Sequence, residues 1–340
     1  MSLYRPALES EEMRSAVNAV IKLQDETELA RAAKESYWWE VRKAAVEMLS
    51  DQSELADIAI NDKDINIRLI AVEKLTDQSV LADVAKNDEY SVVRKVAVKK
   101  LTDPSVLAYV AKKDENMFVR SAAVKKLTDQ SILVDIMNND ENWYVRNEAK
   151  ISWVAVLTDQ SLLADIAIND KDLHVRIAAV ENLTNQSVLA DVAIKDTERD
   201  VRVAAVEKLT DQSLLADIVK NDENLYVRSA AIKKLTDQSV LADIAKNNKD
   251  LFFRISAIKK LTDPSLLADV AINNEFWEAR KVAVANLTDQ NILTDVATND
   301  KSSIVREAAD EKLTKLTDQA DADFCSGCGS KIYQNKSKMV

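Results

Sequence analysis

Two cysteines near the C-terminus carry the most recognisable chemistry in the sequence. Cys325 and Cys328 have the CxxC spacing of a zinc knuckle, and Gly327 and Gly329 permit its tight turn. A structural zinc ion needs four ligands, and the sequence has no second knuckle. We therefore expect no cofactor, with zinc bound only if a second chain supplies its own two cysteines. Of the three interpretations of this half site, a degenerate or truncated knuckle ranks first and a zinc ion shared with a second chain ranks second. A redox CxxC ranks third, because no thioredoxin-like βαβ pattern surrounds it.

The single histidine, His174, gives little support for catalysis. It lies far from both cysteines along the chain, and no motif points to a Ser-His-Asp or Cys-His site built on it. We expect that the chain is not an enzyme.

Arginine and aspartate form a third set, whose spacing is too regular for a catalytic site. Nine of the ten intervals between successive arginines of this set are 26 residues, and one is 30. An aspartate lies six residues before most of these arginines, with asparagine at Asn248 and Asn274 and Ser36 in the first full unit. A pair that recurs in nearly every unit is architectural. The arginines are Arg42, Arg68, Arg94, Arg120, Arg146, Arg176, Arg202, Arg228, Arg254, Arg280 and Arg306.

Each repeat unit contains the pattern of two short helices. The first follows LTDQSVLADIAxND, where Asp77 is the expected N-cap in one copy. Pro104 and Pro264 replace the next residue, the first helical position, where proline is tolerated best. The second helix begins just before the arginine and follows VRxAAVxKL. Two short helices cannot bury their apolar faces alone, so we expect successive pairs to stack around one continuous core.

The Asp…Val-Arg pattern resembles the signature of HEAT repeats over roughly residues 10–319. The resemblance implies an all-α fold, a right-handed α-solenoid of about eleven two-helix, armadillo-type repeats with an N-terminal capping helix. The 26-residue period approaches compact HEAT-like and leucine-rich-variant repeats. We expect a solenoid domain over 1–319 and a flexible tail over 320–340. In the HEAT family these side chains form a hydrogen-bond ladder between neighbouring repeats, which here would comprise Asp62, Arg68, Asp88, Arg94, Asp114, Arg120, Asp140, Arg146, Asp170, Arg176, Asp196, Arg202, Asp222 and Arg228.

The one long interval predicts a lengthened or protruding helix in mid-array. After Arg146 the sequence NEAKISWVAVL is four residues longer than in the other units. Four residues are close to one helical turn, so Leu157 returns to nearly the same face. We expect this helix to carry Trp153 without loss of the repeat register.

Aromatic residues are concentrated in the variable residues before each arginine. Twelve of the 17 aromatic residues lie there. In HEAT-like arrays the second helix usually lines the inner, concave surface, so these rings would share an extended face. The alternative is that they pack between adjacent repeats, since aromatic residues are usually more buried than exposed. We expect a partner-binding surface, because aromatic residues are favoured at interface hot spots. Its residues would be Trp38, Trp39, Phe118, Trp143, Tyr144, Tyr226, Phe252 and Trp277.

The charge of the chain favours a protein partner. The net charge of −11 disfavours a nucleic-acid binder, which needs a basic face, and docking on an anionic membrane. The N-terminal sequence has no apolar signal segment and no apolar run approaches a membrane span, so we expect the cytoplasm. The leading hypothesis is a monomeric scaffold or adaptor that binds a protein or peptide. A single-strand nucleic-acid binder is an alternative, through stacking beside lysines.

The resemblance also leaves some enzyme classes open. Metal-dependent hydroxylases with HEAT-like repeats depend on His-Glu pairs, and this chain has one histidine. DNA glycosylases with similar repeats need a basic groove, which the net charge argues against. Bilin lyases are a further analogy, which bound pigment would reveal in an absorbance spectrum.

Overall fold

The computed structural model describes the backbone of residues 13–327 and the side chains of residues 14–318. Within that range every regular element is an α-helix, 23 in total, from α2 to α24. The chain forms two compact units, residues 1–158 and residues 159–340. Five helix pairs belong to the first unit and six to the second, so the described residues contain the eleven repeats that the sequence predicts.

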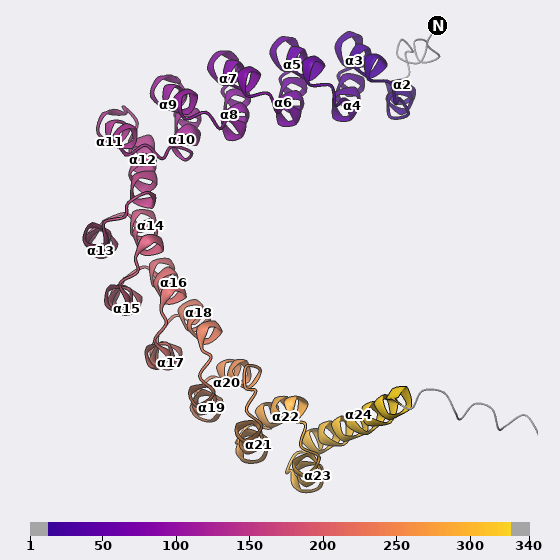
Figure 1. Cartoon of the computed structure of the whole chain (residues 1–340), viewed down its shortest axis with the longest axis vertical. Coiled ribbons are helices and arrows are strands. Elements are labelled where there is room, and N and C mark those ends of the chain that lie inside the picture. Colours follow the sequence, from indigo (N-terminus) through magenta and orange to yellow (C-terminus); the bar gives the residue numbers. More distant parts are fainter. Residues whose placement is uncertain (1–12, 328–340) are drawn as a thin grey trace, which may run out of the picture. The chain divides into compact units, whose positions relative to one another are not determined.

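Unit 1 consists of a single helix followed by the five pairs. In Figure 1 the first helices of the pairs (α3 to α11, odd numbers) form one row and the second helices a parallel row, and α2 packs on α4. The single helix therefore caps the row of second helices, as expected. The helices are α2 (Met13–Val20), α3 (Glu26–Glu35), α4 (Trp39–Met48), α5 (Gln52–Asn61), α6 (Ile65–Lys74), α7 (Gln78–Asn87), α8 (Ser91–Lys100), α9 (Pro104–Lys113), α10 (Met117–Val124), α11 (Gln130–Asn139) and α12 (Trp143–Ala155).

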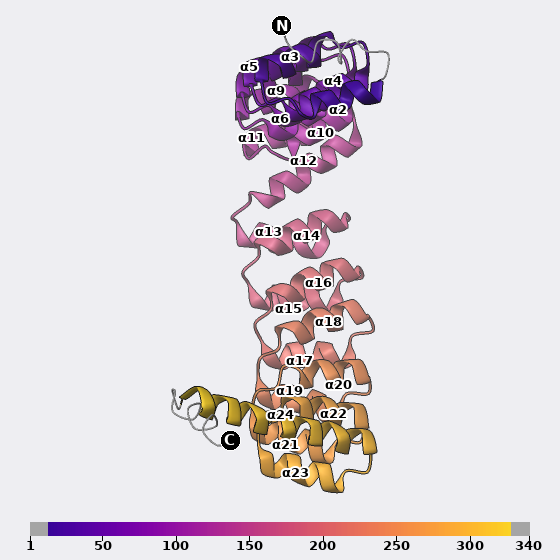
Figure 2. The ribbon, with the colours of Figure 1, turned by 90° about the vertical axis from the view of Figure 1, so that its right-hand side faces the viewer.

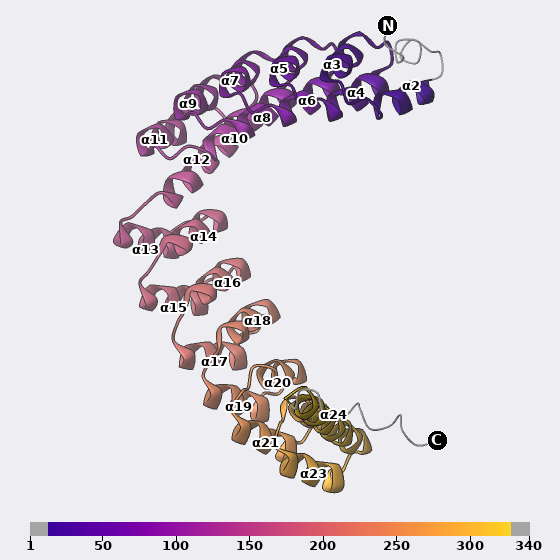
Figure 3. The same cartoon turned by 45° about the vertical axis from the view of Figure 1, so that its right-hand side comes forward.

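Unit 2 repeats this arrangement with six pairs. Figure 3 shows its first helices, α13 to α23, beside a row of second helices, α14 to α24. The helices are α13 (Gln160–Asn169), α14 (Leu173–Asn182), α15 (Gln186–Lys195), α16 (Arg199–Lys208), α17 (Gln212–Asn221), α18 (Leu225–Lys234), α19 (Gln238–Asn247), α20 (Leu251–Ile258), α21 (Pro264–Asn273), α22 (Trp277–Asn286), α23 (Gln290–Asn299) and α24 (Ser303–Gly327).

Side-chain caps determine where the first helices begin. The carboxylate of Asp77 accepts hydrogen bonds from the backbone N–H groups of Ser79 at 2.8 Å and Val80 at 3.3 Å. The Ser79 hydroxyl and these N–H groups lower the pKa of Asp77 below its usual value. Pro104 and Pro264 occupy the first position of their helices, where no intrahelical donor is needed. The predicted helix starts are therefore confirmed.

Aliphatic side chains fill the core of each pair and the seam between pairs. In the third pair of unit 1, Leu81 and Ala85 from α7 and Val93 and Ala97 from α8 are fully buried. Alanine at the repeated contact positions lets short helices approach closely, and valine and leucine then remove apolar area from water. The prediction of an all-helical solenoid is confirmed.

Two helices are longer than the others. Helix α12 has 13 residues, which confirms the predicted lengthening; Val154 and Leu157 are buried, and Trp153 is half-buried against the core of unit 1. Helix α24, the second helix of the last pair of unit 2, has 25 residues and extends beyond the neighbouring helices of that unit (Figure 2). The domain boundary expected at 319/320 falls inside this helix. No helix in the described part of the chain is both long and apolar enough to cross a membrane.

Candidate functional site

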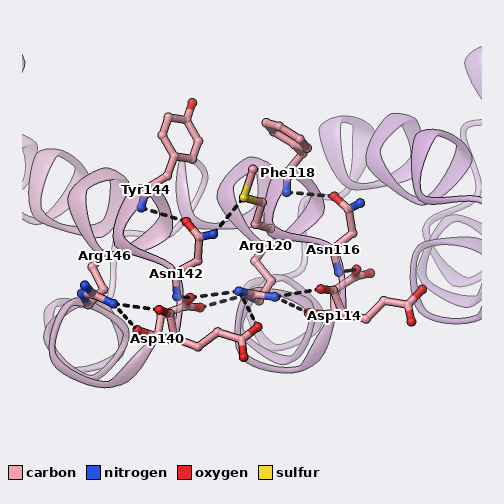
Figure 4. Close-up of polar contacts among 11 residues, drawn as sticks. Asp114, Asn116, Phe118, Arg120, Asp140, Asn142, Tyr144 and Arg146 are labelled. Carbon is pink, nitrogen blue, oxygen red and sulfur yellow. Dashed lines mark hydrogen bonds and ion pairs between the residues drawn. The ribbon is translucent and has the colours of Figure 1, made fainter.

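Within each unit, most of the repeat arginines connect two repeats through their guanidinium groups. Arg94 donates to the carboxylate of Asp114 in the next repeat, Nε to Oδ2 at 2.7 Å and Nη2 to Oδ1 at 2.9 Å. Its Nη1 donates to the carbonyl oxygen of Asp88 in its own repeat at 2.8 Å. Figure 4 shows the equivalent pattern around Arg120, between Asp114 and Asp140. The ion pairs of this ladder are Arg42–Asp62, Arg68–Asp88, Arg94–Asp114, Arg120–Asp140, Arg176–Asp196, Arg202–Asp222 and Arg280–Asp300.

The ladder groups are buried and mutually neutralised. The side chains of Arg94 and Asp114 are 6% and 5% exposed. The hydrogen bond to Asp114 raises the pKa of the Arg94 guanidinium above its usual value. Burial of Asp300 opposes its ionisation, but the hydrogen bond from Arg280 and the N–H of Ser302 hold the pKa of this carboxyl below its usual value. A charge-neutralised, bidentate pair is a structural connection between repeats.

At Arg146, the last predicted ladder arginine of unit 1, Nη1 donates to the carbonyl oxygens of Asp140 at 2.8 Å and Glu141 at 3.0 Å. In unit 2, the Asp170 carbonyl accepts from Arg176 at 2.9 Å. Arg146 and Arg176 therefore both form the ladder hydrogen bond to the carbonyl oxygen of the aspartate in their own repeat.

Two seams of unit 2 have asparagine in place of the ladder aspartate. Arg228 donates Nη2 to Oδ1 of Asn248 at 3.2 Å and Nε to the carbonyl oxygen of Val219 at 2.8 Å. Its guanidinium lies 4.0 Å from the ring centroid of Phe253, which is fully buried where most other repeats have valine. The neutral asparagine removes the counter-charge at the ladder position; the ring face and the carboxylate of Asp250, 3.8 Å from Nη1, supply part of the compensation.

The next arginine is compensated differently. Arg254 donates to the carbonyl oxygens of Asn248 and Lys246 and pairs with Glu275 at 2.6 Å. It lies 4.5 Å from the ring centroid of Phe276, while Asn274 donates to the Ala245 carbonyl at 2.8 Å. The two asparagines were visible in the sequence, but the exchange of partners was not.

Two further ladders connect the repeats near the helix ends. Oε1 of Gln78 accepts from the N–H of Thr102 in the next repeat at 2.8 Å, and its Nε2 donates to the Lys100 carbonyl at 3.3 Å. The last lysine of most second helices donates from Nζ to a carbonyl at the end of the preceding second helix, as Lys126 does to Lys99 at 2.6 Å. Four second helices end in a pair of lysines, and the second lysine of each pair, Lys100, Lys126, Lys234 or Lys260, also caps the preceding repeat.

The ladder also positions the predicted aromatic side chains. Oδ1 of Asp114 accepts from the N–H of Asn116 at 2.8 Å, and Oδ1 of Asn116 then accepts from the N–H of Phe118 at 2.9 Å. The same relay runs from Asp140 through Asn142 to Tyr144. In Figure 4 the rings of Phe118 and Tyr144 point away from the ladder on the same side. Phe118 and Tyr144 therefore lie in the first turn of helices whose N-caps are held by the ladder.

Most of the predicted aromatic residues are exposed. Trp38 and Tyr144 are half-buried, and Trp38 packs against the core. The other six expose a large part of their surface, Trp277 at 38% being the lowest and Trp143 and Tyr226 at 67% the highest. The exposed residues are Trp39, Phe118, Trp143, Tyr226, Phe252 and Trp277.

Phe118, Trp143 and Tyr144 form one cluster of rings on the second helices of unit 1. The ring centroids of Phe118 and Tyr144 are 6.4 Å apart, and those of Trp143 and Tyr144 are 6.0 Å apart, both edge-to-face. Nζ of Lys95 lies 5.7 Å from the centroid of Phe118. In unit 2, the guanidinium of Arg199 lies 4.9 Å from the centroid of Tyr226. Lysine and arginine therefore lie beside the exposed rings in both units.

The predicted zinc site cannot be placed. Cys328 lies outside the described residues, and Cys325 lies in α24 where only the backbone is described. Among the described side chains, no three His, Cys, Asp or Glu residues are grouped to hold a metal ion.

No family model matches the sequence, and no curated protein matches it. Among solved structures, the chain is similar to YibA from Escherichia coli, with 18% sequence identity over 90% of this chain and 98% of that chain and a TM-score of 0.21. A TM-score this low carries no argument. The fold assignment therefore rests on the helix pairs and their ladders, which fit a HEAT-like solenoid.

Proposed function

We propose that this protein is a non-catalytic scaffold that binds another protein through the exposed side chains of its second helices. The observation that carries the proposal is the exposure of six of the eight predicted aromatic residues, while aliphatic side chains fill the core of the repeats. A helical repeat array presents an extended, pre-organised surface, which suits an interaction role. We further propose that the protein is a monomer, binds no cofactor and acts in the cytoplasm.

Packing does not explain these aromatic residues. The residue two positions before the arginine is Phe118, Tyr226 or Phe252 in some repeats, but Asn66 or Asp200 in others. Those polar residues occupy the equivalent exposed position of the same kind of helix. Since the repeat folds with either type, the rings serve something other than the stack. Exposed aromatic residues on rigid elements are the usual anchors of protein interfaces.

The experiment is affinity capture from an extract of the source cells with three baits. The first bait is the wild type, and the second replaces Trp39, Phe118 and Trp143 by alanine, leaving the half-buried Trp38 intact. The third is the matched control Tyr109→Ala, which removes an aromatic residue that is 54% exposed but lies on first helix α9. Far-UV circular dichroism verifies that all three baits are folded.

We expect the wild type and the Tyr109→Ala control to capture one or more specific proteins. The triple variant should not capture them. Equal capture by all three baits would place the binding surface elsewhere. Absence of any specific protein with the wild-type bait would contradict the scaffold function.

A further inference from the structure

The two lysines at the end of each lysine-pair helix have different roles. Lys126 and Lys234 are half-buried and donate to carbonyl oxygens of the preceding repeat at 2.6 and 2.5 Å. The first lysine of each of the four pairs is exposed: these are Lys99, Lys125, Lys233 and Lys259. Three of these exposed lysines, Lys99, Lys233 and Lys259, form no ion pair with the described residues. The structural lysine is required by the stack, and the exposed lysine is not.

The exposed lysine lies five residues after the repeat arginine. The residue type at this position changes together with the residue type two positions before the arginine. The two positions are seven residues apart, about two helical turns, so they lie on one face of the helix. Where the earlier residue is polar, the later one is glutamate in four repeats: the pairs are Glu40 and Glu47, Asn66 and Glu73, His174 and Glu181, and Asp200 and Glu207. Where it is apolar or aromatic, the later one is lysine in four repeats: the pairs are Val92 and Lys99, Phe118 and Lys125, Tyr226 and Lys233, and Phe252 and Lys259.

The remaining three repeats do not follow this rule: Tyr144 with Ile151, Glu278 with Ala285, and Ile304 with Glu311.

The apolar–lysine pairs occur in adjacent repeats and form one patch in each unit. The α8–α10 patch consists of Val92, Lys95, Lys99, Phe118 and Lys125. The α18–α20 patch consists of Tyr226, Lys233, Phe252 and Lys259. The second helices that carry these patches, α8, α10, α18 and α20, contain no aspartate or glutamate. In a chain with a net charge of −11, these are local surfaces of opposite character.

The two patches differ in how far their lysines are free. In the α8–α10 patch, Lys125 pairs with Glu148 of α12 at 3.2 Å, which leaves Lys99 as its exposed lysine without an ion pair. In the α18–α20 patch, both Lys233 and Lys259 are free among the described residues, beside rings exposed at 67% and 60%. We therefore expect the α18–α20 patch to bind the more acidic ligand.

Resting on the scaffold function proposed above, we infer that these two patches bind acidic segments of a protein partner that also carry aliphatic or aromatic side chains. The rings anchor the apolar side chains of the segment, and the exposed lysines pair with its carboxylates. The repeats that carry Glu181 and Glu207 repel the same segment, which confines binding to the patches. A nucleic acid fits less well, because each patch has few free lysines and a polyanion needs a continuous basic stripe.

The test is selection of a random peptide library, displayed on phage, against the full chain. Three proteins are compared: the wild type, the variant Lys233→Glu with Lys259→Glu, and the control Lys249→Glu with Lys301→Glu. The control changes the net charge by the same amount at two exposed loop lysines. The structural lysines Lys234 and Lys260 stay unchanged in all three proteins. Affinities of the selected peptides, and of a single-stranded oligonucleotide, are then measured by fluorescence anisotropy at low and high salt.

We expect the wild type to select net-negative peptides that contain aliphatic or aromatic residues. Their affinity for the α18–α20 variant should fall about tenfold or more, with no such loss for the control and weaker binding at high salt. Selection of neutral or basic peptides, equal binding by the variant, no enriched peptide, or tighter binding of the oligonucleotide would each overturn it. If a variant that combines Lys99→Glu with Lys233→Glu and Lys259→Glu still captures the natural partner and the aromatic variant does not, the acidic preference is wrong while the scaffold function stands.

Discussion

A buried arginine is compensated by different partners in two seams of unit 2, the seam between α22 and α24 and the seam between α18 and α20. In the first, buried Arg280 is neutralised by Asp300 through two hydrogen bonds of 2.7 and 2.9 Å. In the second, Arg228 faces neutral Asn248 and instead contacts a carbonyl oxygen, the face of Phe253 and, at 3.8 Å, the partly exposed carboxylate of Asp250. A buried guanidinium must be compensated, but the repeat does not require the carboxylate at the ladder position to do so. The stack therefore tolerates variation at the ladder when neighbouring residues change with it.

Removing the arginine should separate the two seams most strongly. Arg280→Leu leaves the buried carboxylate of Asp300 without its partner, and we expect a loss of about 3–5 kcal/mol in the free energy of unfolding. Arg228→Leu leaves a neutral amide, a carbonyl oxygen and the partly exposed carboxylate of Asp250, which water can solvate, so we expect a loss of about 1–3 kcal/mol. Urea denaturation followed by hydrogen exchange of each helix measures both. Equal losses would show that the asparagine seam is as dependent on charge as the aspartate seam.

Acid should distinguish the seams next. The folded-state pKa of Asp300 is lowered, so its contribution to stability is present above the unfolded pKa of about 3.9 and is lost as the pH falls through the folded value. Asn248 does not titrate. Hydrogen exchange of α22 and α24, corrected for intrinsic rates, should therefore accelerate below about pH 4 more than exchange of α18 and α20. Asp300→Asn should remove most of this difference, and its persistence in that variant would assign the acid sensitivity to another group.

Converting one seam into the other tests whether the substitutions act together. With Phe253 present, Asn248→Asp should destabilise unit 2, because Arg228 must leave the ring to pair with the carboxylate. With Phe253→Val, the same change should be favourable, since it restores the residues of the regular ladder. A double-mutant cycle should therefore give a coupling energy of about 0.5–3 kcal/mol. Additive effects would mean that Phe253 and Asn248 are independent.

The smallest expected effect concerns the exposed pairs between first helices. Lys112 pairs with Asp135 of the next first helix at 2.6 Å, whereas Lys86 lies over the ring of Tyr109 at 5.3 Å from its centroid. Tyr109→Asp should create an exposed ion pair and change the free energy of unfolding by less than about 1 kcal/mol. Urea denaturation at low and high salt measures this change. A larger effect would give the exposed pairs a weight comparable to the buried ladder.

The regular features of the fold could be predicted from the sequence, because each is repeated. The 26-residue period, the cap at Asp77 and the prolines at Pro104 and Pro264 identify helix starts independently of tertiary structure. The division into two units was not predicted: the one long interval, between Arg146 and Arg176, spans residue 158, but its four extra residues were interpreted only as one more helical turn. The extent of α24 was also missed, because its last turns lack the repeat pattern.

The candidate surface could be predicted only in part. Spacing places Phe118 and Tyr226 on a helix face, but spacing alone does not decide whether a ring packs in a seam or is exposed. The structure separates neighbouring rings of one window: Phe252 is 60% exposed and Phe253 is fully buried. The division of labour within the lysine pairs was not predicted, because it depends on a carbonyl of the preceding repeat.

The most direct test of the scaffold account is site-specific photo-crosslinking in source-cell extract. A photoreactive phenylalanine replaces Phe118 on second helix α10 in one protein and Tyr109 on first helix α9 in the other; both natural residues are exposed, at 50% and 54%. The account predicts a discrete crosslinked protein from position 118 and none from position 109. Crosslinks from position 109 alone, or from neither position, would contradict the assignment of partner binding to the second helices.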